Sequence, residues 1–368
     1  MASSDVLTKF RAPQKPTFTR ARQKQLGRVV MAVVIVIYSI VTLFPFFALF
    51  VRSFVPTKEA TELHLWIPQS EEVSMDAQVG NLSVFYDLDL TDMKEALGIP
   101  LTEFIMARTT LREVSEKYDI PEEEIKDFFA GFYTYNGWIT LLKNIDFFGA
   151  LGRTLLVTVV SLIGITVLSI FTGYGLAGLR RRDQMFIYNL YLLQMVIPAM
   201  LILLPQYMVI QWFVRLFPGY SNPGPTRWAL QLLSLILINI KGTALSTMIF
   251  TSAIGAIHKD IEDSAMIDGA SQWQYVRHIL LPLLKVPIVS LLVIQLPAVY
   301  NQFLEPYVYL DPANSTVLPL MQTVAGQFST NFQVIYSCIF ASVLPLLLLY
   351  LIFRRYFVEG VMAGAIKG

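Results

Sequence analysis

The sequence predicts an all-α integral membrane protein, and three features of its composition support this fold class. Of the 368 residues, 55% are hydrophobic and only 15% are charged, whereas a soluble domain carries about 25% charged residues. The 28 basic and 27 acidic side chains leave a net charge of +1, which argues against nucleic acid as a partner. Cys338 is the only cysteine, so a framework of internal disulfides is excluded.

Six long apolar segments predict six transmembrane helices, because a helix needs roughly 20 mostly apolar residues to cross a bilayer. The segments are 29–51, 154–179, 186–214, about 229–257, 286–304 and 332–353. Only Lys241 interrupts the fourth segment. Continuous apolar runs of this length favour helices over the strands of a membrane barrel. Pro198, Pro205, Pro297 and Pro345 are expected to kink or break their helices.

Lysine and arginine are distributed unevenly around these segments. Sixteen lie in 1–28, in the connections after the second and fourth segments and in the C-terminal part, against two, Arg215 and Arg227, in the opposite short loops. The positive-inside rule therefore places both termini in the cytoplasm. The expected plan is a basic N-terminus at 1–28, a first span at 29–54, an extracytoplasmic segment at 55–149, a five-helix core at 150–357 and a tail at 358–368.

The first external connection is unusually long and acidic. Between residues 55 and 145 it holds 17 Asp or Glu against seven Lys or Arg. Pro121, followed by three glutamates, predicts the start of a helix there. We expect a small helical insert over about 72–133, with a solvated acidic spacer as the alternative. The expected core residues are Leu97, Ile99, Leu101, Phe104, Ile105, Leu111, Ile120, Ile125, Phe128 and Phe129.

The connection at 258–286 carries the most informative pattern. Residues 259–268 predict a short helix, Gly269 a sharp turn and residues 273–284 a second helix. The apolar side chains in this loop suit a groove on a partner protein, and packing on the protein's own bundle is an equal alternative. They are Ile261, Met266, Ile267, Trp273, Tyr275, Val276 and Ile279.

This loop resembles the EAA loop of ABC-importer permeases. The family's E-A-A, G and I-x-L-P elements fall on Asp263-Ser264-Ala265, Gly269 and Ile279-Leu280-Leu281-Pro282, and the extended D-G-A element falls on Asp268-Gly269-Ala270. Asp263 and Ser264 depart from the family's glutamate and alanine. The resemblance implies a contact with an ATPase subunit, made by Asp263 or by the neighbouring Glu262.

Other segments resemble the carbohydrate-importer permeases of the maltose/oligosaccharide class. The tail at 354–368 is similar to that of the subunit whose C-terminus reaches between the ATPases, which implies this role for Gly364, Lys367 and Gly368. We expect residues 361–368 of this tail to thread a cleft rather than to form a stable helix. Residues 298–310 and 318–334 are similar to the fifth span of that subunit and the loop after it. A receptor-facing loop is implied at Gly326, Gln327, Phe328, Ser329, Thr330 and Asn331.

The resemblance implies a non-catalytic subunit of an ATP-driven importer for a carbohydrate, working by alternating access in the bacterial cytoplasmic membrane and surrounded by lipid. Its partners would be a second permease subunit, two ATPase subunits that hold ATP and Mg²⁺, and an extracytoplasmic solute-binding protein. The sequence has no Walker A pattern, no cluster of metal ligands and no G-x-S-x-G element. We therefore expect no catalytic residue, metal or cofactor on this chain.

A gradient-driven secondary transporter is the alternative function. Such proteins normally place ionisable residues at membrane depth, and here only Lys241 lies within a span, with Glu305 near the outer end of the fifth. Tyr300, Asn301 and Lys241 are the candidate residues of a translocation path.

Overall fold

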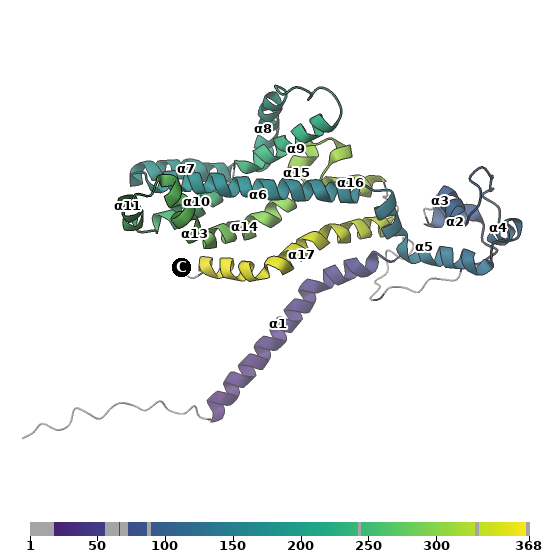
Figure 1. The fold of residues 1–368 in the computed structure, drawn as a ribbon. Coiled ribbons are helices and arrows are strands. Elements are labelled where there is room, and N and C mark those ends of the chain that lie inside the picture. The colour runs from purple at the N-terminus through teal and green to yellow at the C-terminus, as the bar shows by residue number, and fades with distance from the viewer. Residues whose placement is uncertain are drawn as a thin grey trace, which may run out of the picture.

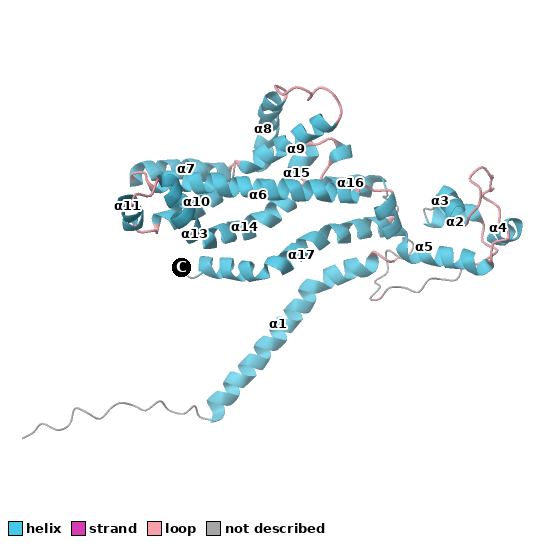
Figure 2. Ribbon diagram, in the orientation of Figure 1, coloured by secondary structure: helices cyan, strands magenta, loops and turns pink. Residues whose placement is uncertain are grey.

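The computed structural model describes residues 18–55, 66, 73–86, 90–241, 244–327 and 331–365. Side chains are described for these residues except 18–24, 84–86, 130–134 and 356–365. All the regular elements in the described ranges are helices (Figure 2), and one isolated bridge pairs Gln78 with Thr110. The all-α fold class predicted from the sequence is confirmed.

Three helices are each long and apolar enough to cross a membrane. They are α1 (Phe18–Arg52), α6 (Phe147–Ala177) and α17 (Phe332–Ala365). Three more candidate spans are bent pairs: α7 (Arg181–Val196) with α8 (Ala199–Val214), α9 (Pro225–Ile240) with α10 (Ala244–Gly255), and the helical stretch 272–283 with α14 (Lys285–Tyr300). Counting each pair as one span gives up to six among the described residues.

The third predicted span is not one helix. α7 and α8 meet at 103°, and Ile197, between them, has an extended backbone with φ −77° and ψ 121°. Pro198 explains the break, because a proline disfavours the helical conformation of the residue before it. Pro205, Pro297 and Pro345 lie inside helices instead.

Helix α6 lies at the centre of the bundle and packs against α9, α10 and α14 (Figure 1). Its contact with α10 is close enough to require a glycine. A Cβ added to Gly173 would lie 2.7 Å from Phe250 Cβ and 2.9 Å from Thr251 N. Small residues allow membrane helices to approach in this way.

The segment after α1 forms a compact helical insert. Its elements are α2 (Val79–Tyr86), α3 (Leu90–Ala96), α4 (Leu111–Tyr118) and α5 (Glu122–Lys143). The predicted core residues that are buried in one cluster are Leu97, Ile99, Ile105, Leu111, Ile120, Ile125 and Phe129, with Phe128 packed at the edge. The prediction is wrong for Leu101 and Phe104, which are 60% and 80% exposed, because they lie in the irregular connection between α3 and α4. The buried residues of these elements thus form one shared apolar core.

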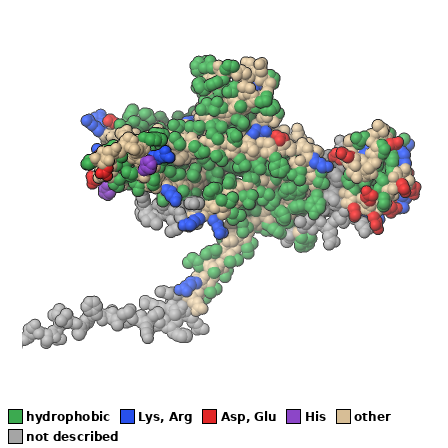
Figure 3. Space-filling model, viewed as in Figure 1, with side chains coloured by type: hydrophobic (Ala, Val, Ile, Leu, Met, Phe, Trp, Pro, Cys, Tyr) green, Lys and Arg blue, Asp and Glu red, His purple; other side chains and the backbone are tan. Residues whose placement is uncertain are grey.

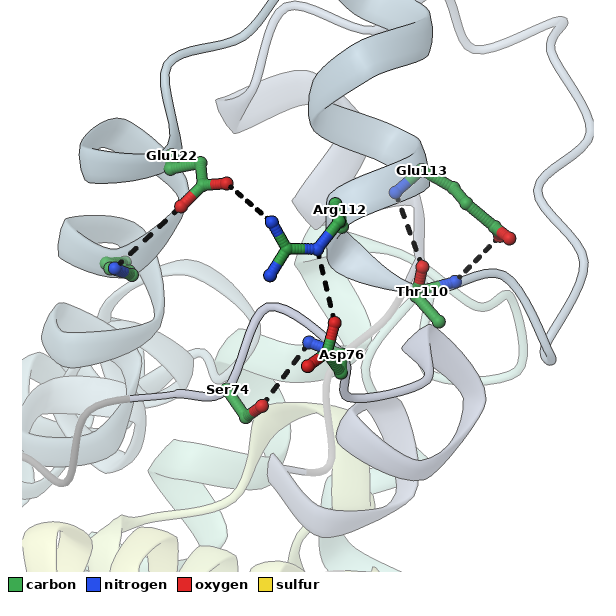
Figure 4. A network of polar contacts seen from close by, with 7 residues as sticks. Ser74, Asp76, Thr110, Arg112, Glu113 and Glu122 are labelled. Carbon is green, nitrogen blue, oxygen red and sulfur yellow. Dashed lines mark hydrogen bonds and ion pairs between the residues drawn. The ribbon is translucent and has the colours of Figure 1, made fainter.

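Polar contacts join three parts of the insert (Figure 4). Arg112 Nε donates to Asp76 Oδ1 at 3.2 Å, and its NH1 donates to Glu122 Oε1 at 3.3 Å. Thr110 and Glu113 form a capping box at the start of α4. The arginine is half exposed, so these ion pairs contribute little to stability, and the buried apolar cluster holds the insert together.

Helix α5 continues to Lys143, past the expected end of the insert at 133, because no proline interrupts it. Its second half packs against α17. Trp138 Nε1 donates to Ser53 Oγ at 3.3 Å, and Ser337 Oγ donates to Ser53 O at 3.1 Å. A Cβ on Gly137 would lie 2.5 Å from Ser337 Oγ. The insert is therefore anchored to α1 and α17.

Candidate functional site

The 258–286 loop lies at the end of the bundle remote from the insert (Figure 1). It contains α11 (Lys259–Ile267), α12 (Gln272–Tyr275), a π-helical turn at Val276–Leu280 and α13 (Leu281–Leu283). Two helical stretches separated by a turn at Gly269 are what the sequence predicts.

Gly269 ends α11 in a left-handed conformation, with φ +84°. Ala270 N donates to Ala265 O at 3.0 Å, and Gly269 N donates to Met266 O at 3.1 Å, which is the pair of bonds of a Schellman cap. An added Cβ on Gly269 would meet no atom within 4 Å. Glycine is needed here for its backbone conformation and not for space.

The second stretch begins with a capping box, in which Gln274 N donates to Ser271 Oγ at 3.3 Å and Ser271 N donates to Gln274 Oε1 at 2.7 Å. The predicted regular helix over 273–284 is interrupted by the π turn, where Leu281 N donates to Val276 O. Pro282 follows directly and has no N–H to continue the α-helical ladder. A π turn at such a point is a common adjustment and is frequent at functional sites.

The apolar side chains of the 258–286 loop divide into two groups. Ala265, Tyr275 and Leu280 are buried in a cluster with residues of α6, α10 and α14. Ile261, Ile267 and Trp273 are exposed, at 39%, 85% and 62%. Packing on the protein's own bundle therefore holds for the buried set, which fixes the loop to the spans, whereas the groove on a partner protein stays a prediction for the exposed set.

The two acidic candidates at the loop face different surroundings. Tyr174 Oη, near the end of α6, donates to Glu262 Oε1 at 2.5 Å, so Glu262 is turned toward the bundle. Asp263 is exposed. Of the remaining motif residues, Ser264, Asp268 and Pro282 are exposed, and Ala270, Ile279 and Leu281 are half-buried.

The residues predicted for the receptor-facing loop and the C-terminal tail do not all lie as the sequence analysis expects. Asn331 is buried, and its Oδ1 accepts from Val334 N at 3.2 Å, so its side chain caps α17 instead of facing a receptor. Gly326 and Gln327 are the last residues of α16 (Val317–Gln327), and residues 328–330 lie outside the described ranges.

In the C-terminal tail, α17 continues through Gly364 to Ala365. The expectation of a non-helical tail is therefore wrong as far as Ala365, and the alanines in this stretch favour helix. Lys367 and Gly368 lie outside the described residues.

The three translocation candidates do not share one site. Tyr300 is buried, and its Oη donates to Ser342 O of α17 at 2.9 Å. Asn301 is exposed beyond the end of α14. Lys241 lines a cavity of about 280 Å³ among α6, α7, α8, α9 and α14, together with Asn239 and Gln302. Sequence reasoning missed these two amides, although both stand out as polar residues in or beside apolar segments.

A bundle of apolar helices that encloses a polar cavity and carries a capped helical loop at one end is the architecture of a membrane transport protein. Residues 165–362 match the family "Binding-protein-dependent transport system inner membrane component". This match covers more than half of the chain, and the chain belongs to that family. It is therefore a multi-pass inner-membrane component of an ABC transport system, a class of subunit that is itself non-catalytic, and the identification made from the loop is confirmed.

Relatives agree with this family, and a solved structure has a similar fold. The chain is 26% identical over 229 residues to the probable starch degradation products transport system permease protein AmyC of Thermoanaerobacterium thermosulfurigenes, covering 62% of this chain and 79% of AmyC. It is 24% identical over 237 residues to the arabinooligosaccharides transport system permease protein AraQ of Bacillus subtilis, covering 64% and 77%. Its fold is similar to a chain of a bacterial ABC transporter involved in alginate import, with a TM-score of 0.59, 15% identity and coverage of 93% of this chain and 100% of the other.

Proposed function

We propose that this chain is one transmembrane subunit of an ATP-driven importer for oligosaccharides, with both termini and the 258–286 loop in the cytoplasm. The observation that carries the proposal is the capped loop, which lies within the family match and is joined to three spans. The relatives' names, starch degradation products and arabino-oligosaccharides, support an oligosaccharide as cargo. A second permease subunit would complete the membrane part.

The loop couples ATP hydrolysis to the spans by moving with them as one body. Tyr275 and Leu280 are 3% and 0% exposed within the cluster that includes α6, α10 and α14. Because packed interiors resist deformation, a push on α11 from closing ATPase subunits is transmitted to those three helices. The spans then change between inward-open and outward-open states. ATP and Mg²⁺ act on the partner ATPases.

The exposed side of the loop is the proposed contact with an ATPase subunit. Ile267 and Trp273 enter an apolar groove on the partner, in the helix-in-groove mode. Asp263 pairs with a basic residue there, since Glu262 is already engaged by Tyr174. Gly364, Lys367 and Gly368 reach the space between the two ATPases.

On the outer face, the insert is proposed to contact the solute-binding protein. Acidic side chains gather over the insert (Figure 3), and Phe104 and Leu101 present exposed apolar surface beside them. Charge at such a surface chiefly sets the association rate and the choice of partner. Replacing Phe104 and Leu101 by serine should weaken binding of the solute-binding protein and leave ATPase assembly intact.

The test of the loop contact is co-purification of the ATPase subunits with the Trp273→Ala variant. A buried aromatic anchor at an interface is worth about 2 kcal/mol or more, so we expect loss of the ATPases at dilutions where the wild-type complex stays assembled. Trp228→Ala is the matched control, because Trp228 is a partly exposed tryptophan at the far end of the bundle, in α9. Equal retention of the ATPases by both variants would overturn the assignment of this surface.

A further inference from the structure

A polar cavity of about 280 Å³ lies within the bundle, where the surrounding helices are otherwise apolar. Its polar lining comes from several elements: Gln194 from α7, Gln206 from α8, Asn239 and Lys241 from the end of α9, Gln295 from α14, and Gln302 and Glu305 from the stretch after α14. Ionisable and amide side chains inside a membrane protein are costly and rare. The concentration of these polar side chains around one small cavity indicates a ligand-binding site.

Two of the amides hold each other in place. Asn239 Nδ2 donates to Gln302 Oε1 at 3.0 Å, and Gln302 Nε2 donates to Asn239 Oδ1 at 2.8 Å. Asn239 Nδ2 also lies 3.3 Å from Ser161 Oγ on α6. These bonds engage both N–H groups of Asn239 Nδ2. The pair fixes one wall of the cavity and leaves one N–H of Gln302 and further lone pairs of the two amide oxygens for a ligand.

Three other side chains have their polar groups available. Within the described residues, Gln194, Gln206 and Lys241 make no hydrogen bond or ion pair. An amide offers two donors and an acceptor, and an ammonium offers three donors. A ligand that enters the cavity can therefore form hydrogen bonds with these three side chains, provided that it carries several hydrogen-bond donors and several acceptors.

We infer that this cavity is a binding site for a neutral carbohydrate, contributed by this subunit itself. Hydroxyl groups are both donors and acceptors, so a sugar ring matches the mixed lining better than an apolar molecule or a simple ion. Lys241 and Glu305 give the lining one positive and one negative charge. A polyanionic sugar would meet Glu305 without a surplus of positive charge. The inference rests on the proposed function and adds the site and the charge class of its cargo.

The size of the cavity limits how much of the cargo it holds. Small-molecule pockets range over roughly 300–1,000 Å³, and this cavity is at the lower end, so it engages one or two sugar units at a time. A path that holds an oligosaccharide only a unit or two at a time binds it weakly enough to release it, as transport requires.

The first experiment measures occupancy without relying on transport. Gln206→Cys in the full complex, held outward-facing with nucleotide and vanadate, is labelled by a small thiol reagent; the native Cys338 is buried and adds little background. We expect a neutral trisaccharide of glucose, xylose or arabinose to slow labelling about tenfold, and an alginate or galacturonate trisaccharide to slow it much less. Gln184→Cys, at the start of α7 and outside the cavity, should label at the same rate with and without sugar.

The second experiment measures the role of the lining in uptake. Lys241→Met should lower ATP-dependent uptake of the neutral sugar about tenfold, the effect of one lost hydrogen bond to a charged group. Lys143→Met, an exposed lysine at the end of α5, is the matched control. Glu305→Gln should reduce the preference for neutral over anionic sugars in the labelling assay.

The outcomes separate this inference from the proposed function. If ATP drives sugar uptake but no sugar protects Gln206→Cys and Lys241→Met transports normally, the site is wrong while the function stands. Stronger protection by the uronate trisaccharides would overturn the charge argument. A complex that takes up no sugar with ATP would instead contradict the proposed function.

Discussion

Replacement of Gly269 isolates the contribution of one backbone angle to coupling. Its φ of +84° lies in the left-handed region, where an L-residue pays roughly 1–2 kcal/mol. No atom lies within 4 Å of an added Cβ, so steric clash adds nothing. A strain of this size lowers the ratio of the capped to the uncapped loop by about 5–30-fold.

We expect Gly269→Val to insert and assemble but to lose most of its binding-protein-stimulated ATPase activity and uptake, because the Schellman cap that orients α11 before Ser271 is weakened. Gly269→Asn should retain much more activity, since asparagine tolerates the left-handed region. Both activities are measured in proteoliposomes with the partner subunits present.

Gly255 provides a matched control, because an added Cβ there also meets no atom within 4 Å and its φ is not in the left-handed region. Gly255→Ala should therefore behave as wild type, whereas Gly269→Ala should be impaired. Full transport by Gly269→Val, or equal effects of alanine at the two glycines, would refute the reasoning.

Three further predictions follow from particular contacts. Tyr174→Phe removes a hydrogen bond to a carboxylate, and amides of α11 should exchange with deuterium about tenfold faster. Gly137→Ala forces α5 away from α17, and overpacking of this kind costs about 1–3 kcal/mol, so limited proteolysis should release the insert sooner. Hydrogen bonds from Lys117 and Tyr118 lower the pKa of Glu103 from its ordinary 4.5; the stability they add is therefore present above that pH and lost as the pH falls through the lowered pKa. The protection factors of the α4 amides, which correct for the pH dependence of intrinsic exchange, should fall on acidification, and less so in Lys117→Met.

Each of these predictions has a control and a contradicting result. Tyr188→Phe on α7 should leave α11 exchange unchanged, and equal exchange in Tyr174→Phe would mean that the hydrogen bond does not hold α11. Gly152→Ala, where an added Cβ meets open space, should not change proteolysis; release of the insert at the same rate in Gly137→Ala would refute its anchoring. An acid response of α4 that is identical in Lys117→Met would show that Glu103 is not its source.

Much of the fold was predictable because bilayer length and helix period constrain it strongly. Long apolar runs identified the candidate spans, and the spacing around Gly269 predicted the turn and the two helical stretches of the loop. The 103° bend at Pro198 was predictable only as a break, since its size depends on the packing of α8. The π turn before Pro282 depends on a single displaced hydrogen bond, which no periodicity reveals.

The side-chain details of the site were less accessible. Nothing in the local sequence distinguishes Glu262 from Asp263, because the residue that engages the Glu262 carboxylate is Tyr174, 88 positions away in the chain. Asn331 resembles a loop residue by composition but is buried as a helix cap. The amides around Lys241 come from parts of the chain that are far apart in sequence, so their meeting is a property of the tertiary fold.

The most direct test of the proposed function is uptake by proteoliposomes that contain this chain with its second permease, ATPases and solute-binding protein. We predict that a neutral oligosaccharide is accumulated only when ATP is present on the ATPase side, and that imposed proton or sodium gradients neither replace ATP nor change the rate. Uptake that persists without ATP and follows an ion gradient would contradict this function and favour a secondary transporter.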